Sequence, residues 1–176
     1  MERFVTISGC SGGGKSALLA ELRRRGYVTV EEPGRRIVSE ELAGHGTALP
    51  WVDPAAFARR AIELSLADRA AAMTSSNWVF FDRGLIDAAA ALQHLTGEAM
   101  TEILGRIHRY NKRVFFTPPW PDIYVTDRER RHSLAEAMEE CSRLAAIYPA
   151  LGYEIRVLPK APVQERADYV LATLAD

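Results

Sequence analysis

A glycine-rich segment that ends in lysine and serine carries the clearest chemical signal in the sequence. Residues 9–16 read Gly-Cys-Ser-Gly-Gly-Gly-Lys-Ser, between an apolar run at residues 4–7 and a helix-like run at residues 17–25. Such a loop surrounds phosphate groups with backbone N–H groups at the N-terminus of a helix. Lys15 is placed to reach the β- and γ-phosphates, and the Ser16 hydroxyl to bind Mg²⁺. The segment predicts a nucleoside triphosphate site formed by Gly9, Ser11, Gly12, Gly13, Gly14, Lys15, Ser16 and Ala17.

A second candidate site follows the apolar residues 79–81, where Asp82 and Arg83 are adjacent. The carboxyl ends of parallel strands converge on the ligand crevice, so Asp82 is expected to face Mg²⁺ through a water molecule. Arg83 places a planar cation near the transferring phosphoryl group or the acceptor. The alternative is structural, with Asp82 capping the next helix and Arg83 lying on the surface. Because the phosphate-binding segment lies upstream, we favour the catalytic and metal-binding roles.

A third candidate site is the segment Glu31-Glu32-Pro33-Gly34-Arg35 at the end of the second predicted strand. In the same crevice, the Glu32 carboxylate would lie across from the γ-phosphate, where a general base for an acceptor hydroxyl is useful. Arg35 supplies a second cation at the start of the next helix, so both residues are candidates for substrate binding. A glutamate beside a helix start is also favourable without any chemistry, and both interpretations of Glu32 stay open.

A basic cluster, Asp127-Arg128-Glu129-Arg130-Arg131-His132, follows a proline-rich loop and precedes a predicted helix. Small-molecule kinases close a mobile segment over the phosphates, and arginines on it neutralise the charge on the transferred group. We expect a lid over about residues 118–133, with Arg128 and Arg131 as its catalytic cations. An ordinary charged surface turn is the alternative.

The candidate residues lie at the ends of strand-like segments that alternate with helix-like ones. Strands are expected at residues 3–8, 27–31, 78–82, 113–117 and 153–158, and helices at residues 15–25, 35–43, 54–75, 85–95, 99–110, 133–147 and 162–175. This alternation is typical of an α/β protein with a parallel sheet covered by helices. Asp53 and Pro54 form a favourable helix start. A chain of 176 residues fits one domain, so we expect a single domain over residues 1–176.

Composition and charge restrict the classes of partner. The formal net charge of −1 at pH 7 gives no support for binding to DNA, RNA or a membrane surface. Cys10 and Cys141 cannot form a disulfide framework, and Cys10 lies inside the phosphate-binding segment, so a reducing cytoplasm is expected. The four histidines lack the spacing of a zinc site. The sequence leaves the oligomeric state open.

Several segments, taken together and in order, resemble one known family. They are residues 9–16, Glu32-Pro33-x-Arg35, Phe80-Phe81-Asp82-Arg83-Gly84, Pro118-Pro119-Trp120 and Tyr148-x-x-Leu151-Gly152-Tyr153. The chain resembles the AAA-type ATPase domain family, which includes the ribosylnicotinamide kinase domain of NadR-type proteins, and more broadly it is similar to P-loop nucleoside and nucleotide kinases. The resemblance implies a three-layer P-loop NTPase fold, a five-stranded parallel sheet in the order 2-3-1-4-5 with helices on both faces, Mg-ATP as phosphoryl donor and an arginine-bearing lid.

The combined signals favour a Mg-ATP-dependent kinase that phosphorylates a hydroxyl of a small nucleoside-like or ribosyl acceptor. Residues 44–53 and the helix at 54–75 are expected to shape the acceptor pocket. Two alternatives remain: an ATPase or GTPase switch that responds to a protein partner, and a nucleotide-binding module without turnover. Asn111-Lys112 is followed by Arg113-Val114, so the guanine-binding motif Asn-Lys-x-Asp is absent and ATP is favoured over GTP. The identity of the acceptor does not follow from the sequence.

Overall fold

The computed structural model describes residues 3–44, 46–123 and 133–175. Within these residues, five parallel strands form the centre of the molecule in the order β2-β3-β1-β4-β5. They are β1 (Phe4–Gly9), β2 (Val28–Val30), β3 (Val79–Asp82), β4 (Arg113–Thr117) and β5 (Glu154–Val157). Each adjacent pair is parallel. The predicted α/β class, the parallel sheet and its strand order are therefore confirmed.

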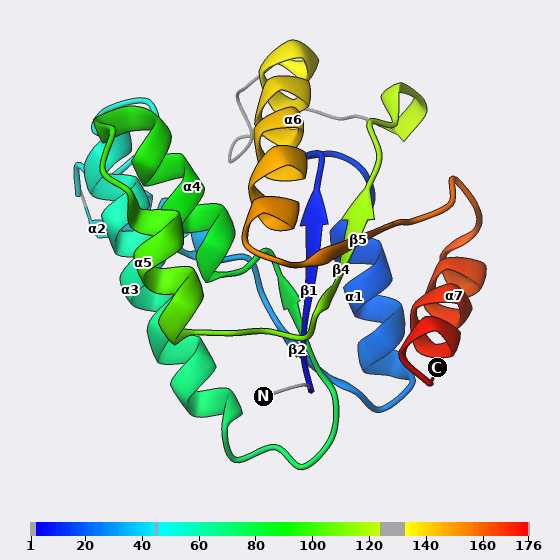
Figure 1. The fold of residues 1–176 in the computed structure, drawn as a ribbon. Helices are drawn as coiled ribbons and strands as arrows, with labels where there is room; N and C mark the ends of the chain where they lie inside the picture. Colours follow the sequence, from blue (N-terminus) through cyan, green and yellow to red (C-terminus); the bar gives the residue numbers. More distant parts are fainter. Residues whose placement is uncertain (1–2, 45, 124–132, 176) are drawn as a thin grey trace.

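Helices cover both faces of this sheet (Figure 1). On one face lie α1 (Lys15–Arg24) and α7 (Val163–Ala175). On the other face lie α3 (Pro54–Ala72), α4 (Leu85–Thr96), α5 (Met100–Ile107) and α6 (Leu134–Ala150), while α2 (Pro33–Gly44) packs against α3. A short 3₁₀ helix, η1 (Pro121–Ile123), follows β4. The result is a three-layer arrangement in which the strands that carry the predicted site are central.

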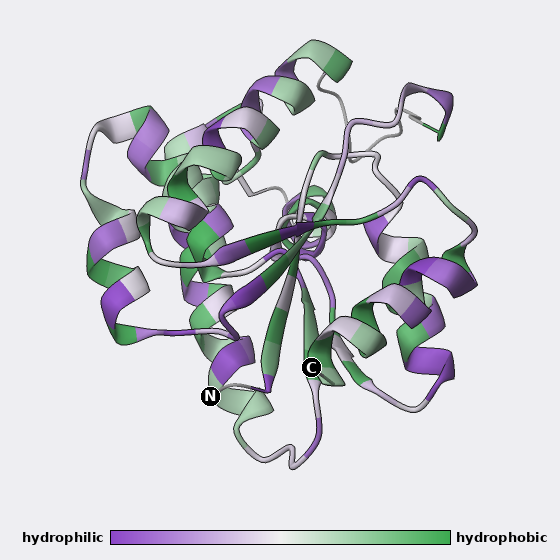
Figure 2. Cartoon of the chain, turned by 45° about the vertical axis from the view of Figure 1, so that its right-hand side comes forward, coloured by the Kyte–Doolittle hydropathy of each residue, from purple (hydrophilic) through white to green (hydrophobic). Residues whose placement is uncertain are grey.

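Side-chain alternation along the strands divides the core into two halves. Phe81 and Phe116 pack on the α3, α4 and α6 side, whereas their neighbours Phe80 and Phe115 pack on the α1 and α7 side. Successive side chains of a strand point to opposite faces, so a central strand covered on both faces is apolar at most positions. Figure 2 shows hydrophobic residues along the strands and on the helices beside them. The core therefore fixes the register of β1 and β3, whose ends carry the phosphate loop and Asp82.

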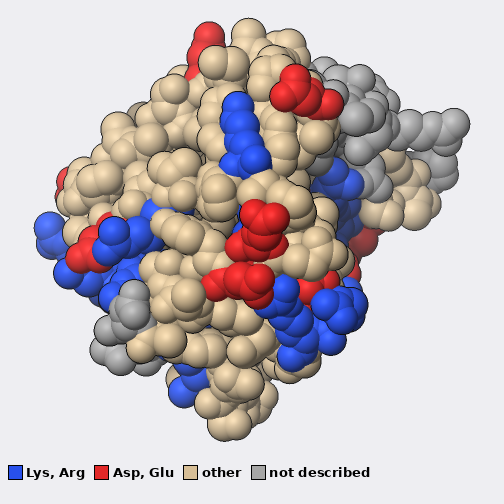
Figure 3. Space-filling view, turned by 90° about the vertical axis from the view of Figure 1, so that its right-hand side faces the viewer, with Lys and Arg blue, Asp and Glu red and all other residues tan. Residues whose placement is uncertain are grey.

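The face formed by α1 and α7 carries acidic and basic side chains next to one another among many uncharged residues (Figure 3). Within the described part of the chain, no helix combines the length and the apolar character that crossing a membrane requires.

Most helix boundaries differ from the sequence-based ranges by a few residues. Asp53 caps α3 as expected, because its carboxylate accepts a hydrogen bond from the backbone N–H of Ala56 at 2.9 Å. Helix α2 begins at Pro33, two residues earlier than predicted. Proline suits the first position of a helix, because the N–H group that it lacks would have no partner within the helix there. Helix α6 continues through Pro149 to Ala150, so this proline lies in the last turn instead of ending the helix before it.

Candidate nucleotide and acceptor site

The phosphate loop, residues 9–16, connects the end of β1 to the start of α1. Gly9 has a φ of +99° and Gly14 a φ of +81°, conformations that glycine adopts without a steric penalty. At Gly9 a Cβ atom would also lie 2.5 Å from the carbonyl oxygen of Thr117, at the end of β4. Strand β4 supports the loop, because the N–H of Cys10 donates to that carbonyl at 2.9 Å and Thr117 Oγ1 donates to the Cys10 carbonyl at 3.1 Å. The loop is thus held in shape by its glycines and by β4.

Lys15 lies in the first turn of α1 with its side chain folded over the loop. Only 6% of its surface is exposed, and Nζ donates to the carbonyl oxygen of Cys10 at 2.9 Å. Burial lowers the pKa of Lys15, because the charged ammonium loses water. A buried ammonium whose hydrogen bond goes to a neutral carbonyl would gain from a phosphate anion, and the contact of Lys15 with a triphosphate stays a prediction.

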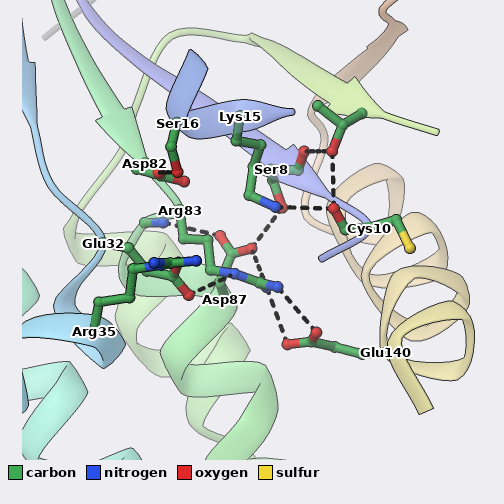
Figure 4. Close-up of polar contacts among 12 residues, drawn as sticks. Ser8, Cys10, Lys15, Ser16, Glu32, Arg35, Asp82, Arg83, Asp87 and Glu140 are labelled. Atoms are coloured by element: carbon green, nitrogen blue, oxygen red, sulfur yellow. Dashed lines mark hydrogen bonds and ion pairs between the residues drawn. The ribbon is translucent and has the colours of Figure 1, made fainter. Parts of the chain in front are cut away.

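Ser16 and Asp82 lie together beside the loop, on α1 and at the end of β3 (Figure 4). Ser16 Oγ donates to Asp82 Oδ2 at 3.4 Å, and Asp82 Oδ1 is buried without a hydrogen-bond partner among the described residues. Burial, and then the negative charge of Glu32, raise the pKa of Asp82 from 3.8 to about 6.

A hydroxyl and a carboxylate with an unsatisfied oxygen fit the preference of Mg²⁺ for oxygen ligands. Over the described ranges, no group of three or more His, Cys, Asp or Glu side chains could hold a metal by itself.

Arg83 follows Asp82 and is surrounded by carboxylates. Its two terminal nitrogens donate to the two carboxylate oxygens of Glu140 on α6, each at 3.0 Å. Its Nε lies 3.2 Å from Glu32 Oε1, and Nη1 lies 3.5 Å from Asp87 Oδ1. The side chain is 11% exposed, and its backbone φ of +61° is uncommon for a residue with a side chain. In this structure the guanidinium joins β3, α4 and α6, and its predicted contact with a phosphoryl group stays a prediction.

Glu32 lies between two cations at the start of α2. Its Oε2 lies 3.6 Å from Arg35 Nε, while its Oε1 faces Arg83. Glu32, Arg35 and Ser11 line both of the hollows described below. The structure therefore brings Glu32 close to the phosphate loop, as expected, without deciding whether it acts as a base.

Asp87, on the first turn of α4, is a buried connection that the sequence analysis did not identify. It accepts hydrogen bonds from Ser8 Oγ at 2.5 Å, from Tyr148 Oη at 2.6 Å and from the N–H of Gly84 at 3.0 Å. These contacts tie β1, the end of β3 and α6 together around Arg83. The spacing Gly84-x-x-Asp87, which matches a helix start with an acidic third residue, was the available signal.

Two adjoining hollows meet at this edge of the sheet. The phosphate cavity of about 620 Å³ is lined by the loop, Glu32, Arg35 and Ile123. The second hollow, which is the candidate acceptor pocket, encloses about 820 Å³ including its open mouth and lies between α2, α3 and α4. Its walls include Pro50, Phe57, Ala58 and Ala61, which belong to the segments expected to shape an acceptor site.

The two lid arginines, Arg128 and Arg131, lie outside the described residues. Just before that segment, Ile123 of η1 lines the phosphate cavity.

Arg166 of α7 is a cation that the sequence analysis missed. It is 5% exposed and donates to the carbonyl oxygen of Gly14 at 3.2 Å, which supports the loop from the α7 side.

Both cysteines are free thiols. Cys10 is fully buried in the phosphate loop, and Cys141 lies on α6. A hydrogen bond from Cys141 lowers the pKa of Cys10 to about 7, in opposition to burial. The Cys10 thiol of the loop and the Cys141 thiol of α6 are thus close enough to influence each other's pKa.

Solved structures with the same fold include two kinases of small molecules. Shikimate kinase from Acinetobacter baumannii, in complex with shikimate, aligns with a TM-score of 0.63 and 13% sequence identity, covering 98% of this chain and 93% of that chain. Deoxyadenosine kinase from M. mycoides, with bound dATP, aligns with a TM-score of 0.53 and 15% identity, covering 98% of this chain and 100% of that chain. At these identities the likeness establishes the fold.

A search of curated proteins gives no match. The sequence profile of the AAA domain family matches residues 4–166, which spans the phosphate loop, Glu32, Asp82 and Arg83. With its phosphate loop, this protein is a P-loop nucleotide-binding domain whose fold resembles that of small-molecule kinases, and the chain belongs to the AAA domain family.

Proposed function

We propose that the protein is a Mg-ATP-dependent kinase that transfers the γ-phosphoryl group to a hydroxyl of a nucleoside-like or ribosyl acceptor. The observation that carries this proposal is the junction of the phosphate cavity and the acceptor pocket. The two hollows share Ser11, Glu32 and Arg35 as lining residues. A hydrolytic switch needs room for one water molecule beside the γ-phosphate, whereas this protein has a separate hollow with walls from α2, α3 and α4 next to the phosphate cavity.

On the donor side, the amides of the phosphate loop and Lys15 hold the triphosphate. Ser16 and Asp82 would hold Mg²⁺, which would supply positive charge to neutralise the phosphates. Buried positions strengthen these interactions, because little water competes for the same groups. Lys15 and Asp82 are 6% and 4% exposed.

On the acceptor side, the Glu32 carboxylate orients the hydroxyl and takes its proton as the new oxygen–phosphorus bond forms. The bond between the γ-phosphorus and the bridging oxygen breaks, and ADP leaves. Arg35 and Arg83 bracket Glu32, so they limit where its carboxylate points. Arg128 and Arg131 are proposed to reach the transferred group from the lid.

The test uses mass spectrometry to measure the ADP that forms from Mg-ATP. The reactions are run with and without a panel of nucleosides, ribosides and other small alcohols. ADP that forms only with particular acceptors supports the kinase. Equal ADP in every reaction indicates a hydrolase, and no ADP in any reaction indicates a binding module. Mg-GTP in parallel reactions tests the expected preference for ATP.

Two variants make the result specific to the phosphate loop. Lys15→Ala is expected to abolish turnover, because the triphosphate loses its buried cation. Lys112→Ala is the matched control, since Lys112 is 69% exposed and pairs with Glu154, and it precedes β4 at the opposite end of that strand from the loop. Full activity of Lys15→Ala would contradict the assignment of the loop.

A further inference from the structure

We infer that the acceptor enters its pocket without a negative charge, as an uncharged hydroxyl compound with an apolar or planar body, and not as a phosphate ester or a hydroxy acid. The inference rests on the proposed function and concerns the same acceptor pocket. It names the class of acceptor by the charge and polarity of the pocket walls.

The first argument is the charge of the pocket. Among the described residues that line it, the acidic side chains outnumber the basic ones: the acids are Glu32, Asp87 and Glu140, and the bases are Arg35 and Arg83. An acceptor with a carboxylate or phosphate would add negative charge to pocket walls whose described side chains already carry an excess of it. Like charges close together in a partly buried site repel strongly, because water screens them poorly.

The second argument is that Arg83 is already engaged. Both of its terminal nitrogens donate to Glu140, and its Nε faces Glu32. To bind an anionic acceptor, Arg83 would have to exchange one of these carboxylates for the ligand. The displaced carboxylate would then lose its contact with the buried guanidinium of Arg83 in a partly buried position, which is costly. Arg35 is in turn 3.6 Å from Glu32.

The third argument is the composition of the remaining walls. Away from the charged end, the pocket is lined by apolar side chains of α2, α3 and α4, namely Val38, Phe57, Ala58, Ala61, Ala88 and Ala91. An uncharged ring or hydrocarbon body gains by removing water from such walls. A charged group placed against them would lose its hydration without a new partner.

The phosphate loop, on the far side of Glu32, provides what the acceptor pocket lacks. Its glycines supply backbone N–H donors, and Lys15 is a buried cation whose partner is a neutral carbonyl. Negative charge is therefore accommodated on the donor side, and the acceptor side is suited to a neutral molecule that presents a hydroxyl toward Glu32.

The experiment compares matched pairs of compounds that differ in one negatively charged group, a phosphate monoester or a carboxylate. Nucleosides are paired with their 3′-monophosphates, which keep the 5′-hydroxyl, and the methyl ester of shikimate is paired with shikimate. Binding is measured by calorimetry with Mg²⁺ and a non-hydrolysable ATP analogue, and transfer is measured with Mg-ATP. We expect the uncharged member to bind at least about tenfold more tightly in each pair that binds. Equal or tighter binding of the charged members would overturn the inference.

A variant tests whether the carboxylates cause this preference. Glu140→Gln removes one negative charge and one of the two acceptor oxygens that face Arg83, so the ratio between uncharged and charged members should fall by about tenfold. Glu139→Gln is the matched control, because Glu139 is the exposed neighbour of Glu140 on the same helix. An unchanged ratio in Glu140→Gln would contradict the argument, and thermal melts of both variants confirm that they fold.

The outcomes separate this inference from the proposed function. Phosphoryl transfer to a charged acceptor would overturn the inference and leave the kinase intact. Tight binding of uncharged members without ADP in any reaction would overturn the kinase and support the charge preference. If no uncharged member binds at all, the inference is wrong.

Discussion

Two buried carboxylates of this protein have opposite electrostatic surroundings. Glu21, on α1, is 6% exposed and lies 2.7 Å from Arg24 Nη2 and 2.7 Å from Arg25 Nε. Asp82, at the end of β3, is 4% exposed and has one buried oxygen without a partner in the described part of the chain. One carboxylate is satisfied by the protein itself, and the other is the one that we propose binds Mg²⁺.

The two pKa values express this difference. Hydrogen bonds from Arg24 and then Arg25 lower the pKa of Glu21 to about 2. Burial, followed by the charge of Glu32, raises the pKa of Asp82 to about 6. On the α1 and α7 face, acidic and basic side chains lie side by side (Figure 3). At the carboxyl edge of the sheet, the ionised form of Asp82 is disfavoured by burial and by the nearby charge of Glu32. Groups with strongly perturbed pKa values in a cleft are candidates for function, and the contrast separates structural charges from functional ones.

Among the substitutions that test the contrast between Glu21 and Asp82, Asp82→Asn should have the largest effect on activity and stability. The variant loses the carboxylate proposed to organise Mg²⁺, and kcat should fall by about 100-fold. In metal-free protein at pH 8 the same change removes a buried charge, so the free energy of unfolding should rise by up to about 3 kcal/mol. Steady-state kinetics and urea unfolding measure the two effects. Full Mg-dependent activity, or a loss of stability, would place Asp82 among the structural carboxylates. Glu63→Gln, an exposed acid of α3, is the control.

The pH dependence of that stability difference is the second prediction. The folded-state pKa of Asp82, about 6, lies above its ordinary value of 3.8. The folded protein therefore holds this proton more tightly than the unfolded chain does. The contribution of Asp82 is most favourable below about pH 4 and is lost as the pH rises through about 6. In EDTA, the stability gain of Asp82→Asn over the wild type should grow between these values and then level off. A gain that is constant over pH 4–8 would be inconsistent with the raised pKa of Asp82.

Sequence reasoning succeeded where the signal is local. The phosphate loop is a continuous segment whose glycines are needed for its backbone shape, and apolar strands such as residues 79–81 identify the central sheet. Asp53 and Pro54 marked the start of α3 correctly. The order of the strands followed from the resemblance to P-loop kinases, since a single sequence does not reveal which strands are neighbours.

Sequence reasoning failed where the partners are far apart in the chain. Glu140 lies in the middle of α6, with no motif around it, and only folding brings it to Arg83, 57 residues away in sequence. The role of Asp87 depends in the same way on Tyr148, which is 61 residues away. Arg83 has the residue type expected of a phosphate-binding group, but its neighbours in space, and not its neighbours in sequence, decide its partners.

Tyr148→Phe tests Asp87, a carboxylate whose surroundings are intermediate between those of Glu21 and Asp82. Asp87 is as buried as Glu21 and Asp82, but its partners are mainly neutral groups: Ser8, Tyr148 and the N–H of Gly84. Removing the Tyr148 hydroxyl deletes a buried 2.6 Å hydrogen bond, so stability should fall by about 1–2 kcal/mol in urea unfolding. Tyr169→Phe, on the more exposed α7, is the control. Unchanged stability would mean that Asp87 is held by its other contacts alone.

Glu21→Gln should have the smallest effect and should act on stability alone. The folded-state pKa of about 2 lies below the ordinary 4.5, so the contribution of Glu21 to stability is present above about pH 4.5 and is lost as the pH falls toward 2. At pH 7 the Tm should decrease, by less than in Tyr148→Phe, because Arg24 is 70% exposed and solvent screens the pair. This decrease should disappear as the pH is lowered from 4.5 to 2, and kcat at pH 7 should equal that of the wild type. If kcat falls while the thermal melt is normal, Glu21 acts on the nucleotide site through α1, whose first turn carries Lys15 and Ser16. The separation between structural and functional carboxylates would then be wrong for this helix.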